Sequence, residues 1–360
     1  MSSKLTVLLW NPDRARAPFG GHAIQMDMTV EALSRINGIS VRVCHEEIPD
    51  WHGVDVVHGL GLQLSHIREA RRRRVPVCLS VIYVSKAYRE RWLAQEPRWR
   101  TMLGRARIAG AMSFAAARGR HLAKSEALAW SAIESRANFE AADMLLPNSQ
   151  MEADTIVRDL AITTPMRVVP NAVDPGRFPP GLPWEQREGV LYVGRLEPHK
   201  NQLGLIQALR GTRIRLTIVG GQHPHHAAYA AAVRAQAGGA VRVVGQTPHD
   251  ELKDFYARAR VHAVPSGFET TGLVSLEAAI AGCNVVTTEV GYAREYFGDM
   301  AWYCAPRDPD SIRSAVLAAL AAPPRDTLRR RILDRYTWDH AAAATAAAYR
   351  ELVGAPILGR

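Results

Sequence analysis

Residues 264–282 read VPSGFETTGLVSLEAAIAG. A predicted strand ends at Pro265, a loop with two glycines follows, and a helix is expected to begin near Gly272. Thr270–Thr271 supplies candidate N-cap residues for that helix. A strand, a glycine-containing loop and a helix form the repeating unit of parallel α/β sheets, which bind ligands at the carboxyl ends of their strands. We therefore expect this stretch to form part of a ligand site.

Two acidic residues flank the start of the expected helix. Glu269 lies in the loop and Glu277 about one turn inside the helix. A spacing of eight residues would separate them by about 80° on one continuous helix, whereas a loop followed by a helix lets both face one crevice. The N–H groups of residues 271–273 would be free there and would favour an anionic or hydroxyl-rich ligand. Alone, the pattern also fits a solvated loop acid and a first-turn acid that complements the helix dipole.

A second stretch, Gly194–Lys200 (GRLEPHK), follows the first strand expected in the second half of the chain. Arg195 and Lys200 are five residues apart, which fits one cation on a loop and one at the start of a helix. Two cations beside a helix N-terminus predict a diphosphate site. Gly220, which follows the next expected strand, gives another turn where a backbone can approach closely.

Short apolar runs alternate with helical patterns along most of the chain, which predicts an α/β fold with parallel sheets. The expected strands are residues 5–10, 41–44, 55–58, 77–82, 144–147 and 166–169, then 190–193, 215–219, 240–244, 262–265 and 284–288. A connector rich in Pro and Gly, residues 170–189, divides the two series. We expect domains at residues 1–175 and 176–335, and a final helix within 336–360 that packs back on the first domain.

The net charge of +10 is concentrated in one part of the chain. Residues 68–124 contain 15 Lys and Arg against 3 Asp and Glu, a net charge of +12. Such a basic block attracts a membrane surface, a nucleic acid or an acidic substrate, or it is only a solvated arginine-rich surface. Trp92 and Trp99 lie seven residues apart within it, a helical spacing that favours an amphipathic membrane-docking helix over a single-strand nucleic-acid surface. We therefore expect no nucleic-acid partner.

The expected location is the cytoplasm. No apolar run reaches the length of a membrane span, and the apolar stretch at residues 5–10 is too short for a secretion signal. The four cysteines lack metal-ligand spacing and are expected to be buried free thiols: Cys44, Cys78, Cys283 and Cys304. With the basic block, this suggests a protein that attaches peripherally to the inner face of the membrane.

The chain resembles the retaining glycosyltransferases of family 4, which have the GT-B fold of two Rossmann-like doubly wound domains facing each other. The resemblance covers the second domain and is thin in the first. The matching motifs occur in the family's order: Gly20–Gly21, Pro170–Asp174, Gly194–Leu196 with Lys200, Ile218–Gly221, Pro265–Ser266 with Glu269, Gly272–Leu273 and Leu276–Ala278, and Gly282 with Val285–Val286.

The resemblance implies transfer of a sugar from a nucleoside-diphosphate sugar to an acceptor hydroxyl with retention of configuration. The first domain would bind a glycan or lipid-linked acceptor, as in surface polysaccharide or lipopolysaccharide assembly, and the second the donor. Three residues would act catalytically: Glu269 at the sugar hydroxyls, and Arg195 and Lys200 on the leaving diphosphate. Seven would bind the donor: Glu277 at the ribose, Gly20 and Gly21 over the phosphates, and Thr271, Gly272, Leu273 and Gly220. No metal or other cofactor would be needed.

Three questions stay open: a departure from the family pattern, a possible metal-binding motif, and other functions of the protein. The family often carries a histidine where this chain has Ile82–Tyr83, and the possible substitutes are His22, His58 and His121. Asp308–Asp310 matches a metal-binding D-x-D pattern, but its place before a helix favours an N-cap. The other functions considered are a nucleotide-sugar 2-epimerase on the same fold and a basic nucleic-acid-binding or scaffold protein.

Overall fold

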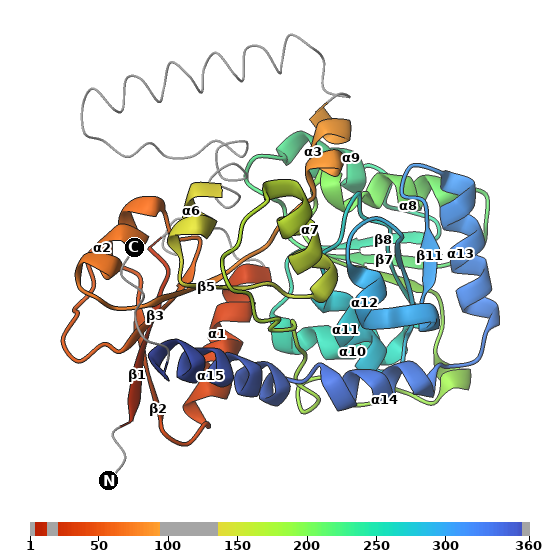
Figure 1. Cartoon of the computed structure of the whole chain (residues 1–360). Coiled ribbons are helices and arrows are strands. Elements are labelled where there is room, and N and C mark those ends of the chain that lie inside the picture. The colour runs from red at the N-terminus through yellow and green to blue at the C-terminus, as the bar shows by residue number, and fades with distance from the viewer. Residues whose placement is uncertain (1–3, 13–20, 94–135, 355–360) are drawn as a thin grey trace.

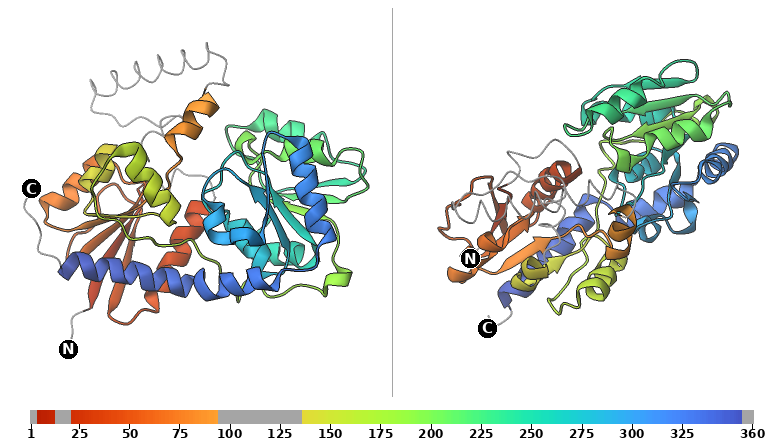
Figure 2. Two further views of the ribbon diagram at one scale, coloured as in Figure 1. Left: turned by 45° about the vertical axis from the view of Figure 1, so that its right-hand side comes forward. Right: turned by 90° about the horizontal axis from the view of Figure 1, so that it is seen from above.

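The computed structural model describes residues 4–12, 21–93 and 136–354. These residues form two α/β domains that lie side by side, each built on one parallel sheet with helices on its faces (Figures 1 and 2). Gly20, His121, Trp99 and most of the basic block, residues 94–124, lie outside the described residues. The predicted α/β class with two doubly wound domains is confirmed.

The first sheet has five parallel strands in the order β2-β1-β3-β4-β5. Their bounds are β1 Leu5–Trp10, β2 Ile39–Cys44, β3 Val56–Leu60, β4 Val77–Ser80 and β5 Met144–Leu146. The strand predicted at residues 166–169 is wrong, because only Met166 pairs there, in an isolated bridge to Leu145. Pro165 and Pro170 bracket the segment, and prolines lack the N–H that a ladder needs.

Helices cover both faces of this first sheet. They are α1 Gly21–Ser34, α2 Leu64–Arg72, α6 Arg136–Ala141 and α7 Gln150–Leu160, whereas α3 Lys86–Leu93 lies beside the second domain (Figure 1). The chain's last helix, α15 Trp338–Gly354, also packs on the first domain, where its buried Trp338 and Tyr349 join the core that contains Val7 and Met26. In Figure 1 this dark-blue helix crosses α1, against which it packs, so the chain returns to the domain where it started.

The second sheet has six parallel strands in the order β11-β10-β9-β6-β7-β8. Their bounds are β6 Val190–Val193, β7 Leu216–Val219, β8 Val241–Val244, β9 Val261–Val264, β10 Asn284–Thr288 and β11 Trp302–Cys304. The direction of winding reverses between β6 and β9, and ligands of doubly wound sheets bind at such a switch point. The loops that follow β6 and β9 are therefore expected to form the site.

The second domain also contains the short 3-10 helices η2 Trp184–Gln186, η3 Pro198–Lys200, η4 His249–Glu251 and η5 Gly298–Met300. Its α-helices are α8 Gln202–Leu209, α9 Ala227–Arg234, α10 Leu252–Arg258, α11 Leu273–Ile280, α12 Ala293–Phe297, α13 Pro309–Ala321 and α14 Asp326–Arg335. Asp308 caps α13, because its carboxylate accepts hydrogen bonds from the N–H groups of Asp310 and Ser311. The capping role predicted for Asp308 is confirmed.

Contacts at several places join the domains. The carboxylate of Glu295 on α12 accepts hydrogen bonds at 2.8 Å from the backbone N–H groups of Gln150 and Met151, where α7 begins. A carboxylate at a helix N-terminus is stabilised by the helix dipole as well as by these bonds. Elsewhere, Tyr88 of α3 packs against Phe268 and Tyr292 of the second domain. The loops after β9 and β10 therefore touch the first domain.

Cys78, Cys283 and Cys304 are buried and Cys44 is partly buried, and all four are free thiols, as predicted. None of the helices in the described part of the chain combines the length and the apolar character that crossing a membrane requires.

Candidate functional site

The loops that follow β6 and β9 are tied together at the switch point. Asn201 Nδ2 donates a hydrogen bond of 3.0 Å to the carbonyl of Pro265, and Gly267 N donates one of 2.8 Å to the carbonyl of His199. Asn201 adopts a left-handed backbone conformation with φ of 56°, which asparagine tolerates better than most residues. These bonds bring the Gly194–Lys200 stretch against the loop that carries Glu269.

Lys200 and Glu269 form the central ion pair of this site, with 2.5 Å between Nζ and Oε1. Glu269 is 5% exposed. Burial by itself raises the pKa of Glu269, but the charges of Lys200 and His199 outweigh it, so the pKa lies below its usual value. The loop is fixed from behind: Glu269 N donates to the carbonyl of Val290, and the carbonyl of Glu269 accepts from Tyr292 N.

Arg195 also has a carboxylate partner. Its guanidinium lies 3.3 Å from Oε1 of Glu197, two residues further along the same loop. The carbonyl of Arg195 accepts a hydrogen bond of 2.7 Å from Gln202 at the start of α8, which fixes the loop backbone. Both predicted phosphate-binding cations thus lie on the loop after β6, and each is paired with an acid that the sequence motif alone did not identify as its partner.

The start of α11 differs from the prediction. Gly272, not Thr270 or Thr271, is the N-cap, and no side chain caps the helix. Gly272 has φ of 77°, a left-handed conformation that β-branched threonine avoids. Thr271 is buried, and its hydroxyl accepts a hydrogen bond of 3.0 Å from Asn171 Nδ2 in the linker. Leu273 is the first helical residue, so its N–H is among those that a helix leaves unpaired.

Glu277 lies in the first turns of α11 and is 6% exposed. Its Oε1 is 2.8 Å from Nε2 of His249 on η4, and its Oε2 accepts a hydrogen bond of 2.8 Å from the hydroxyl of Tyr256 on α10. Sequence reasoning missed both partners. The available signal was their position, because His249 follows β8 at the same edge of the sheet as the other site loops.

A narrow crevice between the domains opens beside Glu277. It is lined by Ile24 and Met28 of α1, by linker residues that include Asp174 and Arg177, and by His249, Leu273 and Trp338. Glu269 is not part of this lining; its carboxylate pairs with Lys200. Of the two predicted acids, Glu277 lines this crevice and Glu269 does not.

The predicted glycines occupy close approaches. Gly220 follows β7, and a Cβ there would collide with the carbonyl oxygen of Gly194, so the loops after β6 and β7 can touch only with glycine at this position. Gly220 N donates to the carbonyls of Val244 and Gly245. Gly21 is the first residue of α1, at the carboxyl edge of the first sheet.

His58, one of the possible substitutes for the family histidine, has a structural role in the first domain. Its Nδ1 lies 2.7 Å from the hydroxyl of Tyr349, and its Nε2 lies 2.7 Å from the hydroxyl of Ser80. Burial lowers the pKa of His58 to about 4, so the ring is neutral near pH 7. The side chain of His22 is outside the described part of the structure.

A residue that sequence reasoning missed is Tyr88 of α3, whose hydroxyl lies 3.5 Å from Nδ1 of His199. Burial raises the pKa of Tyr88 to about 12, so it stays protonated at neutral pH. Its ring centroid is 5.0 Å from that of Phe268, the residue before Glu269. The first domain thus contributes a phenol beside the Lys200–Glu269 pair.

Part of the chain matches a known protein family. Residues 178–335 match the family model described as glycosyl transferases group 1. A glycogen synthase of Mycobacterium tuberculosis (strain CDC 1551 / Oshkosh) is 34% identical over 196 residues, which cover 51% of this chain and 47% of that relative. The chain therefore spans about half the length of the curated relatives that it matches.

Two solved structures cover nearly all of both chains. A sucrose-phosphate synthase from Thermosynechococcus elongatus superposes with a TM-score of 0.72 at 19% identity, over 98% of this chain and 100% of the other. HepE of Anabaena, in complex with UDP and glucose, superposes with a TM-score of 0.69 at 14% identity, over 97% and 100%. Residues 178–335 therefore match the glycosyl transferases group 1 model, and the chain as a whole has the GT-B fold.

Proposed function

We propose that this protein transfers a sugar from a nucleoside-diphosphate sugar to an acceptor hydroxyl, with retention of anomeric configuration. One observation carries the proposal: the Lys200–Glu269 pair and Glu277 flank the first turn of α11 at the switch point of the second sheet. The group 1 domain match and the likeness to a structure that holds UDP and glucose support the same donor class.

The proposed roles follow from charge. Breaking the anomeric bond leaves a diphosphate with growing negative charge, which Arg195 and Lys200 would stabilise. Each cation is paired with an acid, so the diphosphate would share Arg195 with Glu197 and Lys200 with Glu269. The N–H groups of the Gly272 cap and Leu273 would receive hydroxyl or phosphate oxygens.

Glu277 would hold the ribose hydroxyls, since its carboxylate lies in a crevice and is oriented by two protein donors. Glu269 would contact the sugar, beside the N-cap of α11. Gly20 and Gly21 would close over the phosphates from the first domain. Closure would exclude water from the site and favour transfer over hydrolysis.

The test begins with a panel of nucleoside-diphosphate sugars scored by thermal stabilisation, because a ligand that binds only the native state raises its melting temperature. Each stabilising donor is then incubated with glycan and lipid-linked acceptors, and the product linkage is read by NMR. Transfer with the donor's anomeric configuration supports the proposal. Stabilisation by no donor, or a product that is only the 2-epimer, would overturn it.

We also propose that the basic block, residues 68–124, docks the protein on the cytoplasmic face of an anionic membrane, near a lipid-linked acceptor in surface polysaccharide assembly. Its charge of +12 and its tryptophans support this. Each Lys or Arg at an anionic surface adds about 1 kcal/mol. Co-sedimentation with anionic but not neutral vesicles at low salt is expected. Equal binding to both, or binding to neither, would rule docking out.

A further inference from the structure

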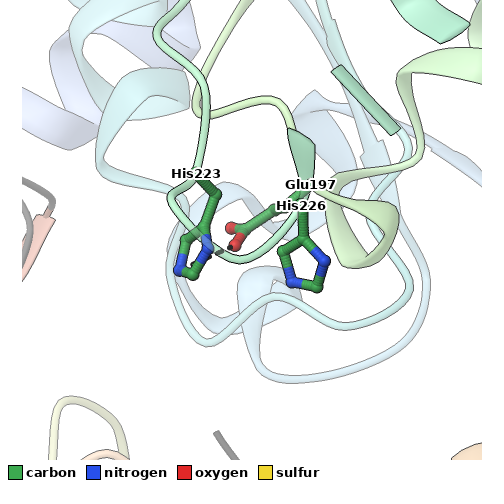
Figure 3. A group of neighbouring side chains, drawn as sticks. All are labelled: Glu197, His223 and His226. Atoms are coloured by element: carbon green, nitrogen blue, oxygen red, sulfur yellow. Dashed lines mark ion pairs between the residues drawn. The ribbon is translucent and has the colours of Figure 1, made fainter. Parts of the chain in front are cut away.

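A cluster of three potential metal ligands lies beside the loop that carries Arg195 and Lys200. Glu197 comes from the loop after β6, and His223 and His226 come from the loop between β7 and α9. Figure 3 shows the three side chains converging from these two loops. Glu197 and His223 are buried and His226 is half-buried, so the cluster is closed on the protein side and reachable through His226.

The potential ligand atoms of the three side chains lie slightly further apart than the ligands of a bound metal ion. One ligand atom from each residue lies within 4.8 Å of the other two, and His223 Nε2 lies 3.9 Å from Glu197 Oε2. Four-coordinate zinc, with bonds of about 2.0–2.2 Å, brings neighbouring ligand atoms to roughly 3.3 Å of one another. The side chains must therefore close by at most about 1.5 Å, which is within the reach of rotation at the half-buried His226.

We propose that Glu197, His223 and His226 bind one divalent transition-metal ion of the zinc type. Two imidazoles and one carboxylate are ligands that zinc accepts, whereas magnesium and calcium require sets made of oxygen atoms. Three protein ligands leave a fourth position for water. The ion offsets the negative charge of Glu197, a residue that is only 7% exposed.

Existing contacts of the cluster bear on metal binding. Arg195 contacts Oε1 of Glu197, while Oε2 faces His223, so the two oxygens can serve the guanidinium and the ion separately. His223 Nδ1 accepts a hydrogen bond of 3.2 Å from His225 N. A neutral imidazole that coordinates a metal through Nε2 carries its proton on Nδ1. Nδ1 of His223 can then no longer accept the hydrogen bond from His225 N, and the loss of this bond slightly reduces the free energy of metal binding.

The position of the site suggests what the ion does. The loops after β6 and β7 already meet through the hydrogen bond from Leu196 N to the carbonyl of Gly221, at 2.9 Å. A metal bound across them would add a second tie and hold the backbone from which Arg195 extends. The ion would therefore hold the loop after β6 in position without contacting a substrate.

The experiment measures zinc binding to the full chain, purified without an added polyhistidine sequence and stripped of metal. Zn²⁺ is titrated by calorimetry, and Co²⁺ is used as a spectroscopic probe because its visible absorption reports nitrogen and oxygen ligands in a tetrahedral field. The variants are Glu197→Gln and His226→Ala, with His225→Ala as matched control. His225 is an exposed histidine on the same loop that offers no ligand to the cluster.

One equivalent of Zn²⁺ is expected to bind wild type and His225→Ala alike. Mutation of a residue that only hydrogen-bonds to a metal ligand lowers metal affinity by up to about 100-fold. Removal of a ligand itself should therefore lower the affinity for Zn²⁺ by at least about 100-fold. Circular dichroism checks that Glu197→Gln and His226→Ala remain folded. The proposal is overturned if wild type shows no saturable binding at one equivalent, or if folded His226→Ala binds as tightly as His225→Ala.

Discussion

Nε2 of His249 lies 2.8 Å from Oε1 of Glu277, a contact that joins η4 to α11 across 28 positions of sequence. The hydroxyl of Tyr256 holds the other carboxylate oxygen. Glu277 is therefore oriented by protein donors from both sides before any ligand arrives. Such preorganisation reduces the conformational entropy that binding must overcome.

The first prediction concerns pH. The hydrogen bond that His249 donates to Glu277 raises the pKa of His249 above its usual value of 6.5. The protonated His249 therefore stabilises the fold, and this contribution is complete at pH values below the usual pKa of 6.5. It is lost as pH rises through the raised pKa of the folded state. We expect the melting temperature of wild type to fall more steeply than that of His249→Gln between about pH 6 and pH 8. His225→Gln, at an exposed histidine, should keep the wild-type slope; equal slopes in wild type and His249→Gln would contradict the pairing.

The second prediction concerns donor binding. Glu277→Ala should lower donor turnover at least about tenfold, because a lost charge-assisted hydrogen bond costs about 1.5–3 kcal/mol and 1.4 kcal/mol is one decade. Steady-state kinetics with an identified donor measures it. Glu251→Gln alters an exposed acid on η4, near His249, and should leave turnover unchanged. Wild-type turnover in a folded Glu277→Ala protein would remove Glu277 from the donor site.

The strands that sequence reasoning placed well are those buried on both faces. Val190–Val193 and Asn284–Thr288 form unbroken buried runs, and their predicted bounds match the structure. The missed strand, Trp302–Cys304, is three residues long and lies at the sheet edge, where two of its side chains are only half-buried. A segment that short carries no periodic signal.

The pairings within the site could not be read from the sequence for a different reason. Lys200 and Glu269 are 69 positions apart, and their contact depends on how two loops meet at the switch point. Thr271 has a good capping side chain, but the turn needs a left-handed residue at the cap, so Gly272 takes that place. Motifs identified which residues to examine, whereas tertiary structure determined which of them touch.

The third prediction concerns the Lys200–Glu269 pair. Lys200→Met leaves a buried carboxylate without its cation, which costs about 3–5 kcal/mol, and we expect the lower end because the Lys200 side chain is 25% exposed. Adding Glu269→Gln should recover most of that loss. Urea denaturation of the wild type, both single variants and the double variant measures the coupling. If the two single effects simply add, the pair contributes nothing to stability.

The same pair predicts a response to acid. The folded-state pKa of Glu269 is lowered, so its contribution to stability is present above the usual value of 4.5 and is lost as pH falls through the lowered pKa. The Glu269→Gln protein should therefore lose less stability than wild type on acidification through that range.

The fourth prediction is that sugar transfer persists in excess EDTA. Arg195 and Lys200 supply two positive charges on the loop after β6, and cations of this kind can stabilise a leaving diphosphate in place of a metal. Removal of zinc from the Glu197 cluster should alter loop order without abolishing transfer. A collapse of activity that magnesium or manganese restores would contradict this prediction and return attention to Asp308 and Asp310.

The last prediction tests the backbone of the α11 cap. Gly272 has φ of 77°, and an added Cβ would meet Ser275 Oγ at 3.4 Å and Glu269 Oε2 at 3.8 Å, which are ordinary contacts. The cost of Gly272→Ala is therefore conformational, about 1–2 kcal/mol for an L-residue held in the left-handed region. For a domain of this size that lowers the melting temperature by roughly 2–8 °C.

The matched control for this change is Gly245→Ala. A Cβ at Gly245 meets nothing within 4 Å, and the φ of Gly245 lies outside the left-handed range. The melting temperature of the Gly245→Ala protein should therefore stay close to that of wild type. Calorimetry on both variants decides the matter. If the Gly272→Ala protein has the same melting temperature as wild type, the cap is not held in the left-handed conformation. Donor affinity should fall in Gly272→Ala and not in Gly245→Ala, because only the former disturbs the N–H groups that α11 presents to the ligand.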